Sequence, residues 1–174
     1  MSLHWPPKLH WLLAISAAVI FLDRLTKTIV TMKVPIGDSI PIVPHLLFIS
    51  HWTNEGAAFS LFADTASPHS VRWALVAFSL LASLVVLAVM IRLGNTINRT
   101  TVALALIFAG ALGNVHDRIV YGSVVYFIEV HIIHYHWPDF NVADSAVVIG
   151  ACLLLLDSFL TKSPGEPTRD QPAA

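Results

Sequence analysis

The chain is poor in charge and in cysteine. Only 12% of its 174 residues are Asp, Glu, Lys or Arg, whereas an ordinary soluble domain has about 25%. The formal net charge of −1 gives no basic field for nucleic acid, so no nucleic-acid partner is expected. The one cysteine, Cys152, cannot form an intrachain disulfide and cannot alone build a structural zinc site. These shortages exclude a disulfide-stapled secreted domain and a nucleic-acid-binding domain.

What the chain has in excess is apolar sequence. Hydrophobic residues make up 56% of it, and they concentrate in a few long runs. A helical membrane span needs about 20 residues, and four runs, at about 9–30, 73–91, 100–116 and 143–160, approach or reach this length. The first run passes into Asp23 and Arg24 without a small-residue cleavage site, which indicates a retained helix. The sequence predicts an all-α membrane protein, a bundle of four transmembrane helices.

The basic residues near the ends of these spans predict an orientation. With four spans both termini lie on one side, and that side carries more Lys and Arg. The residues counted there are Lys8, Arg92, Arg99, Lys162 and Arg169, against Lys33, Arg72 and Arg118 on the other side. By the positive-inside rule the termini are expected in the cytoplasm.

The two loop regions on the outer side differ from the spans in composition. Region 31–70 contains Pro41 and Pro44 among Ile, Val and Phe residues, a pattern that forbids a helix and favours short strands. With region 117–142 it is expected to form a small periplasmic β-rich subdomain. Residues 1–162 are predicted to be a single membrane domain. The Pro-, Gly- and charge-rich segment 163–174 is expected to be a disordered cytoplasmic tail.

Polar residues are predicted to meet at the outer ends of three spans. An ionisable group inside a span costs several kcal/mol, so each needs a reason. Asp23 and Lys27 lie four residues apart on the first span and share a helix face. The third span ends with Asn114, Asp117 and Arg118, and the fourth begins with Asn141 and Asp144. Two interpretations remain open: an ion-pair network that locks the bundle, or a reaction or binding site.

Asp144 is the strongest candidate for a chemical role. Asn141 can cap the fourth helix, which would place Asp144 in the first turn, where free N–H groups and the helix dipole favour an ionised carboxylate. Such a group suits a base that activates water. Aspartic peptidase chemistry needs two acidic groups close together, one ionised and one protonated.

Four motifs in order identify a family resemblance. They are LDRLTK at 22–27, TNEGAAF at 53–59, GNVHDR at 113–118 and FNVAD at 140–144. Over about residues 9–160 the chain resembles the lipoprotein signal peptidases (signal peptidase II, prolipoprotein signal peptidase). The resemblance implies a multi-pass aspartic endopeptidase of the bacterial inner membrane, with its active site at the periplasmic face. Its substrate would be a diacylglyceryl-modified prolipoprotein, with membrane lipid around it; we expect a monomer and no cofactor.

The resemblance also implies roles for particular residues. Asp144 matches one catalytic aspartate. Supporting or substrate-binding positions are Asp23, Lys27, Asn54, Gly56, Asn114, Asp117, Arg118 and Asn141. The position of the other catalytic aspartate holds Tyr126. A phenol, with an ordinary pKa near 10, can donate a hydrogen bond to a carbonyl but is a poor general base at neutral pH.

Three hypotheses follow from Tyr126. In the first, the chain is a variant of an active enzyme. In the second, it is a rewired peptidase that uses Asp144 with Tyr126 or Glu129. In the third, it is a non-catalytic relative that binds lipoprotein precursors. Glu129 would lie on a neighbouring face if its segment is helical and on the opposite face if it is a strand. Asp117 is expected in a supporting role, and Asp157, about 20 Å along the helix from Asp144, is too far away.

Two other functions are weighed against a peptidase. His131, His134, His136 and Asp139 fall close together and could bind zinc, but their spacing is not that of a well-known site, so we expect no metal. A small transporter would need polar groups through the depth of the membrane, and the spans at 73–91 and 100–115 offer few.

Overall fold

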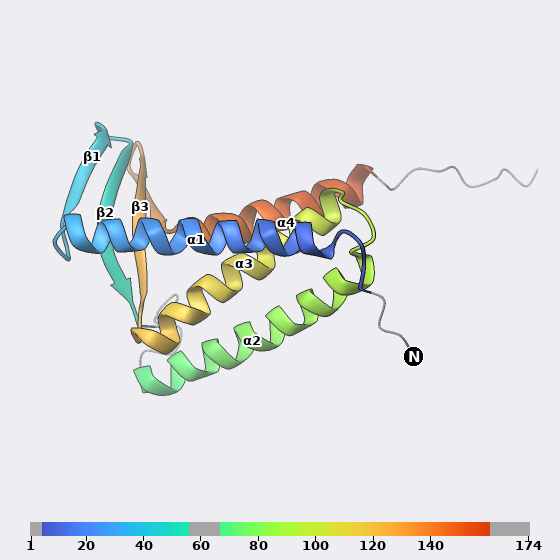
Figure 1. Cartoon of the computed structure of the whole chain (residues 1–174). Helices are drawn as coiled ribbons and strands as arrows, with labels where there is room; N and C mark the ends of the chain where they lie inside the picture. The colour runs from blue at the N-terminus through green and yellow to red at the C-terminus, as the bar shows by residue number, and fades with distance from the viewer. Residues whose placement is uncertain (1–4, 56–66, 161–174) are drawn as a thin grey trace, which may run out of the picture.

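The computed structural model describes residues 5–55 and 67–160. Four helices and one four-stranded sheet make up this part of the chain (Figure 1). The helices are α1 (Leu9–Lys33), α2 (Pro68–Leu93), α3 (Arg99–Val120) and α4 (Val142–Leu160). The strands are β1 (Ser39–Val43), β2 (Leu47–Asn54), β3 (Val124–Ile132) and β4 (Tyr135–Phe140). The predicted combination of apolar helices with a small β-rich region is confirmed.

Three of the helices are long and apolar enough to cross a membrane, as judged by length and composition. They are α2 from His69, α3 and α4. Their surfaces carry large exposed apolar side chains, among them Phe78, Leu84 and Phe159, which is the surface expected of helices bathed in lipid. The first predicted span corresponds to α1, whose second half carries Asp23, Arg24, Lys27 and Lys33.

Each of these three helices begins at a recognisable cap. The side chain of Ser67 accepts a hydrogen bond from the N–H of Ser70 at the start of α2, and Pro68 occupies the first turn, where its missing N–H costs nothing. Asn98 and Thr101 form a reciprocal capping box at the start of α3. Asn141 and Asp144 do the same for α4.

The sheet lies at one end of the helix bundle, and the first residue of α1 and the last of α4 lie at the other end (Figure 1). All three strand pairs are antiparallel, in the order β1-β2-β3-β4. Pro41 lies in β1 and Pro138 in β4, the two edge strands, where a residue without an N–H is tolerated. Phe127 of β3 packs against Val30 of α1 and Val34 at the C-terminal cap of that helix, and this contact joins the sheet to the bundle.

The helices extend beyond the predicted spans at several positions. α2 begins at Pro68, five residues before the predicted span, and α1 continues to Lys33. α3 continues to Val120, so residues 117–120, predicted to belong to the outer loop region, are helical. Hydropathy did not predict this continuation of the helix, because the segment begins with the charged residues Asp117 and Arg118. The expected tail 163–174 lies outside the described residues.

Glycine allows α3 and α4 to pack closely. A Cβ atom at Gly110 would lie 2.2 Å from the carbonyl oxygen of Ala143, and one at Gly150 would lie 2.7 Å from the carbonyl oxygen of Ala103. Both clashes are with backbone, which cannot turn aside as a side chain can. Any side chain at either position would therefore push the two helices apart.

Gly110→Ala is expected to destabilise the fold. Overpacking of a close contact costs about 1–3 kcal/mol, so the thermal unfolding midpoint of the purified protein in detergent should fall. Ala151→Leu is the matched control, because it enlarges an exposed position on α4. Equal midpoints for Gly110→Ala and the wild-type protein would show that the helices are not in this close contact.

Candidate active site

A buried lysine lies at the centre of the polar residues at the sheet end of the bundle. Only 2% of the Lys27 side chain is exposed, and its Nζ lies 2.7 Å from Asp23 Oδ2 and 2.6 Å from Asp117 Oδ2. The ammonium also donates to Asn114 Oδ1 at 3.1 Å. An ammonium removed from water needs such partners, because an unpaired buried charge is very costly. Lys27 thereby joins α1 to α3.

Asp23 extends the contact to the fourth helix. Its Oδ2 binds Lys27, while its Oδ1 accepts a hydrogen bond of 3.0 Å from the backbone N–H of Ala143 in the first turn of α4. Gly113 of α3 makes room for this carboxylate, since a Cβ there would lie 3.1 Å from Asp23 Oδ2. The predicted convergence of polar groups from three helices is confirmed.

Asn114 links Lys27 to Asp144, because its side-chain amide forms a hydrogen bond with each of them. The Oδ1 atom of Asn114 accepts from Lys27 Nζ and, at 3.2 Å, from Asn141 Nδ2. Because a lysine ammonium has only donors, this oxygen must face Lys27 and the amide nitrogen must face the other way. That nitrogen donates to Asp144 Oδ1 at 2.7 Å.

Asn141 holds the same carboxylate from its other side. Its backbone N–H donates to Asp144 Oδ2 at 3.2 Å, and its side-chain oxygen accepts from the N–H of Asp144 at 2.9 Å. The predicted cap by Asn141, with Asp144 in the first turn, is confirmed. Both oxygens of Asp144 thus accept hydrogen bonds, which is the pattern of an ionised carboxylate. Asn141 Nδ2 also donates to the carbonyl of Val125, which ties α4 to β3.

Tyr126 lies on β3, close enough to Asp144 for the two groups to interact electrostatically. Burial raises the pKa of the Tyr126 phenol, and the charge of Asp144 raises it further. The charge of Arg118 and a hydrogen bond with the Asn54 side chain act in the opposite direction and lower the same pKa. The phenol therefore lies among three of the residues that the sequence predicted for the site: Asp144, Arg118 and Asn54. It is a proton donor, since the raised pKa keeps it neutral at physiological pH.

An apolar groove opens beside Asp144. It has a volume of about 380 Å³ and runs along α4 beneath the end of β4. Apart from Asp144 and Ser145, its lining is apolar: Trp137, Phe140, Val148 and Ile149. A carboxylate at the edge of an apolar groove is suited to a substrate whose reacting bond lies next to a hydrophobic segment.

None of the three acids weighed from the sequence, Glu129, Asp117 and Asp157, takes the place of a second catalytic carboxylate. Residues 124–132 form a strand, so Glu129 lies on the opposite face of β3 from Tyr126, and its Oε1 lies 2.6 Å from His131 Nε2. Asp117 is occupied by Lys27 and Arg24 and is 1% exposed. Asp157 lies near the far end of α4, where it accepts from Arg99 and Thr100. Asp117 and Asp157 are thus held by other partners, and Glu129 faces away.

The histidines of the β3–β4 hairpin form a separate cluster. The rings of His131 and His136 stack with their centres 3.9 Å apart. Burial raises the pKa of Asp139, and the nearby carboxylate of Glu129 adds to this. Within residues 5–55 and 67–160 no group of three or more His, Cys, Asp or Glu side chains is arranged to hold a metal ion.

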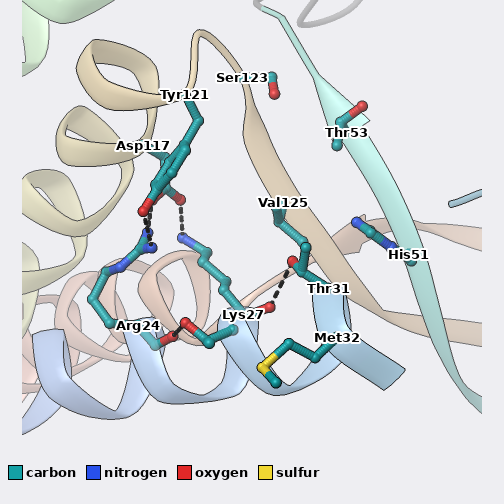
Figure 2. Close-up of a pocket in the computed structure, with 11 residues that line it drawn as sticks. Arg24, Lys27, Thr31, Met32, His51, Thr53, Asp117, Tyr121, Ser123 and Val125 are labelled. Atoms are coloured by element: carbon teal, nitrogen blue, oxygen red, sulfur yellow. Dashed lines mark hydrogen bonds and ion pairs between the residues drawn. The ribbon is translucent and has the colours of Figure 1, made fainter. Parts of the chain in front are cut away.

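One predicted site residue is outside the structure and one contributor was missed. Gly56 lies outside the described residues. Arg24, which the sequence analysis did not include in the site, forms an ion pair with Asp117 and donates to the Tyr121 hydroxyl at 3.1 Å (Figure 2). The signal was present in the sequence, because an arginine beside Asp23 in a span also requires a partner.

The comparisons with known proteins agree with these motifs. The family model described as signal peptidase (SPase) II matches residues 15–160. The lipoprotein signal peptidase of Pseudomonas putida is 39% identical over 164 residues, which cover 94% of each chain. That of Pseudomonas aeruginosa is 40% identical over 160 residues, covering 91% of this chain and 93% of the relative.

A solved structure matches the fold as well. It is a bacterial membrane enzyme structure obtained by the in meso method at 2.3 Å resolution. The TM-score is 0.73 at 29% sequence identity, and the match covers 98% of this chain and all of the other. The resemblance inferred from the four motifs is confirmed.

Lys27→Met is expected to destabilise the protein strongly. The change leaves Asp23 and Asp117 buried without their common cation, and breaking a buried pair costs about 3–5 kcal/mol. The thermal unfolding midpoint in detergent checks this, with Lys33→Met, an exposed lysine at the end of the same helix, as the control. Adding Asp23→Asn to Lys27→Met should restore part of the loss. A midpoint unchanged by Lys27→Met would refute the network.

The Tyr126 phenol is expected to ionise above its ordinary pKa of about 10. The folded protein holds the proton more tightly than the unfolded chain. This contribution to stability is therefore full below about pH 10 and is lost as the pH rises through the folded pKa. The difference in tyrosinate absorbance between wild type and Tyr126→Phe isolates this group from Tyr121 and Tyr135. Ionisation below pH 10 would show that Arg118 and Asn54 outweigh burial and Asp144.

Proposed function

The chain belongs to the signal peptidase II family of aspartic-type endopeptidases, which remove signal peptides from prolipoproteins, and we propose that it performs this cleavage with Asp144 as general base and Tyr126 as hydrogen-bond donor. The observation that carries the proposal is the position of Asp144. Its two oxygens are held by Asn114 and Asn141, beside a half-buried phenol and at the edge of an apolar groove.

The proposed reaction begins with the activation of water. The Asp144 carboxylate takes a proton from a water molecule, whose oxygen attacks the carbonyl carbon of the scissile peptide bond. The carbonyl oxygen becomes an oxyanion, and the neutral Tyr126 hydroxyl donates a hydrogen bond to it. Arg118 supports this charge from nearby. Its Nε has no hydrogen-bond partner among the residues that the structure describes.

The second half of the reaction returns the proton. The tetrahedral intermediate collapses, its C–N bond breaks, and the protonated Asp144 gives its proton to the leaving amine. Asp144 is again ionised and both peptide products are free. Tyr126 does not change its protonation state, so the step needs only one carboxylate. In this scheme the paired carboxylates of an ordinary aspartic peptidase are replaced by a carboxylate and a phenol.

The apolar groove suggests where the substrate binds. Its lining by Trp137, Phe140, Val148 and Ile149 would accommodate apolar substrate groups, including the acyl chains of a diacylglyceryl-modified prolipoprotein. Asp23, Lys27, Asn114, Asp117 and Asn141 hold the base in place, and Asn54 holds Tyr126. Gly56 is proposed to contact the peptide.

The membrane arrangement is part of the proposal. The helices α1 to α4 form four spans of one domain in the bacterial inner membrane, with the termini in the cytoplasm. This orientation is supported by the excess of Lys and Arg at that end of the bundle. The sheet and the active site then lie at the periplasmic face, and the protein acts as a monomer.

The expected result of the substitutions is specific. With purified protein and a diacylglyceryl-modified precursor, Asp144→Asn should lower kcat by about 10²–10⁴ through the loss of the base. Tyr126→Phe should lower kcat by about 10²–10³, the loss typical of one oxyanion donor. Asp157→Asn is the matched control, an acid on the same helix whose partners are Arg99 and Thr100. Release of signal peptide is the measured quantity.

Tyr126→Asp distinguishes the proposed cleavage mechanism from the alternative that the chain binds precursors without cleaving them. The variant should cleave with an optimum shifted to lower pH, because one of two neighbouring carboxylates must then be protonated. If the wild-type protein binds precursor without cleaving it while Tyr126→Asp cleaves, Tyr126 does not replace the acid and the proposal is wrong. Full activity in Tyr126→Phe would also contradict it.

A further inference from the structure

A second cavity lies on the other side of the Lys27 network from the active-site groove. Its volume is about 310 Å³, and it is enclosed by the second half of α1, the end of α3, and strands β2 and β3 (Figure 2). It shares no lining residue with the groove beside Asp144, and neither Asp144 nor Tyr126 lines it. The cleavage reaction therefore does not account for it.

The accessible charge of this cavity is positive. Its one acidic lining residue is Asp117, which is 1% exposed and whose two oxygens are already paired with Arg24 and Lys27. The Arg24 side chain is 25% exposed. Its guanidinium has five N–H donors, of which the contacts found in the described residues use one for Asp117 and one for the Tyr121 hydroxyl. The remaining donors are available to an anion.

Hydroxyl groups also line this cavity. Thr28, Thr31, Thr53 and Ser123 all line the cavity. The first two donate to carbonyls of α1, whereas Thr53 and Ser123 lie on the sheet side (Figure 2). An arginine together with hydroxyl donors such as those of Thr53 and Ser123 is a typical set of ligands for phosphate oxygens.

An apolar stripe on α1 leads away from the cavity. Phe21, Leu25, Ile29 and Met32 are between 42% and 76% exposed. Their spacing of four, four and three residues puts them on one face of the helix over about 16 Å. Met32 also lines the cavity, so a polar recess and an apolar track are continuous.

We propose that this cavity binds the phosphodiester headgroup of an anionic membrane phospholipid, with the phosphate at Arg24 and the acyl chains along the apolar stripe of α1. The charge of Arg24 and the hydroxyls favour binding of the phosphate. The apolar stripe on α1 favours a ligand with acyl chains over a free anion. Through its phosphate the bound lipid contacts Arg24, which is paired with Asp117. It therefore lies against the same ion pairs that, through Lys27 and Asn114, orient Asp144.

Lipid binding by the purified protein in detergent tests the proposal without any substrate. Short-chain phosphatidylglycerol should raise the thermal unfolding midpoint in a saturable manner. Diacylglycerol, which lacks the phosphate, and glycerol 3-phosphate, which lacks the chains, should have little effect. An equal shift with glycerol 3-phosphate would show a simple anion site, and an equal shift with diacylglycerol would show apolar packing alone. Either result overturns the proposal.

Substitutions locate the site. Arg24→Gln should weaken phosphatidylglycerol binding about 10- to 100-fold, the value of a charged hydrogen bond. Arg99→Gln, which removes an arginine paired with Asp157 at the far end of the bundle, is the control. Because Arg24→Gln also disturbs Asp117, the pair Thr53→Val and Ser123→Ala provides a second test that leaves the ion pairs intact. Unchanged affinity in both sets of variants would show that the lipid binds elsewhere.

Discussion

The site depends on a single ammonium group that has been removed from water. Lys27 Nζ is satisfied by one carboxylate of its own helix, Asp23, and by one carboxylate and one amide of α3. Asp23 in turn uses its second oxygen to accept the N–H of Ala143 at the start of α4. The electrostatic requirement of one side chain therefore fixes three helices relative to one another, and the small residues of α3 allow the close approach that this needs.

The same requirement reaches the reacting group through Asn114. The side-chain oxygen of Asn114 accepts a hydrogen bond from Lys27, so the amide nitrogen points the other way and donates to Asp144. Buried polar networks of this kind are rigid when every member is satisfied. The phenol of Tyr126 then has a defined carboxylate to face. On the other side of the network, Arg24 connects Asp117 to the cavity proposed to hold a lipid phosphate.

Short-range rules were enough for part of this arrangement. The four-residue spacing of Asp23 and Lys27 and the three-residue spacing of Asn141 and Asp144 are helix signals, and the structure confirms both contacts. The prolines of 31–70 argued against a helix and its Ile, Val and Phe residues predicted strands, and β1 and β2 are there. The segment around Tyr126 stayed ambiguous, because an apolar run such as VVYFIEVHI fits strand or helix by periodicity alone. Its pairing with β2 and β4 makes it a strand and so puts Glu129 on the opposite face of β3 from Tyr126. This pairing involves segments distant in the sequence, so local patterns could not predict it. The sequence indicated that Arg24 needs a partner but not which one, because its partners are 93 and 97 residues away.

The most direct test is a crystal structure of the protein with a precursor peptide whose scissile carbonyl is replaced by a hydroxyl-bearing carbon. The account predicts that this hydroxyl lies within hydrogen-bond distance of both an Asp144 oxygen and the Tyr126 phenol, while Asn114 still links Asp144 to Lys27. A hydroxyl bound away from Asp144, or bound to Asp144 with the phenol of Tyr126 turned aside, would contradict it.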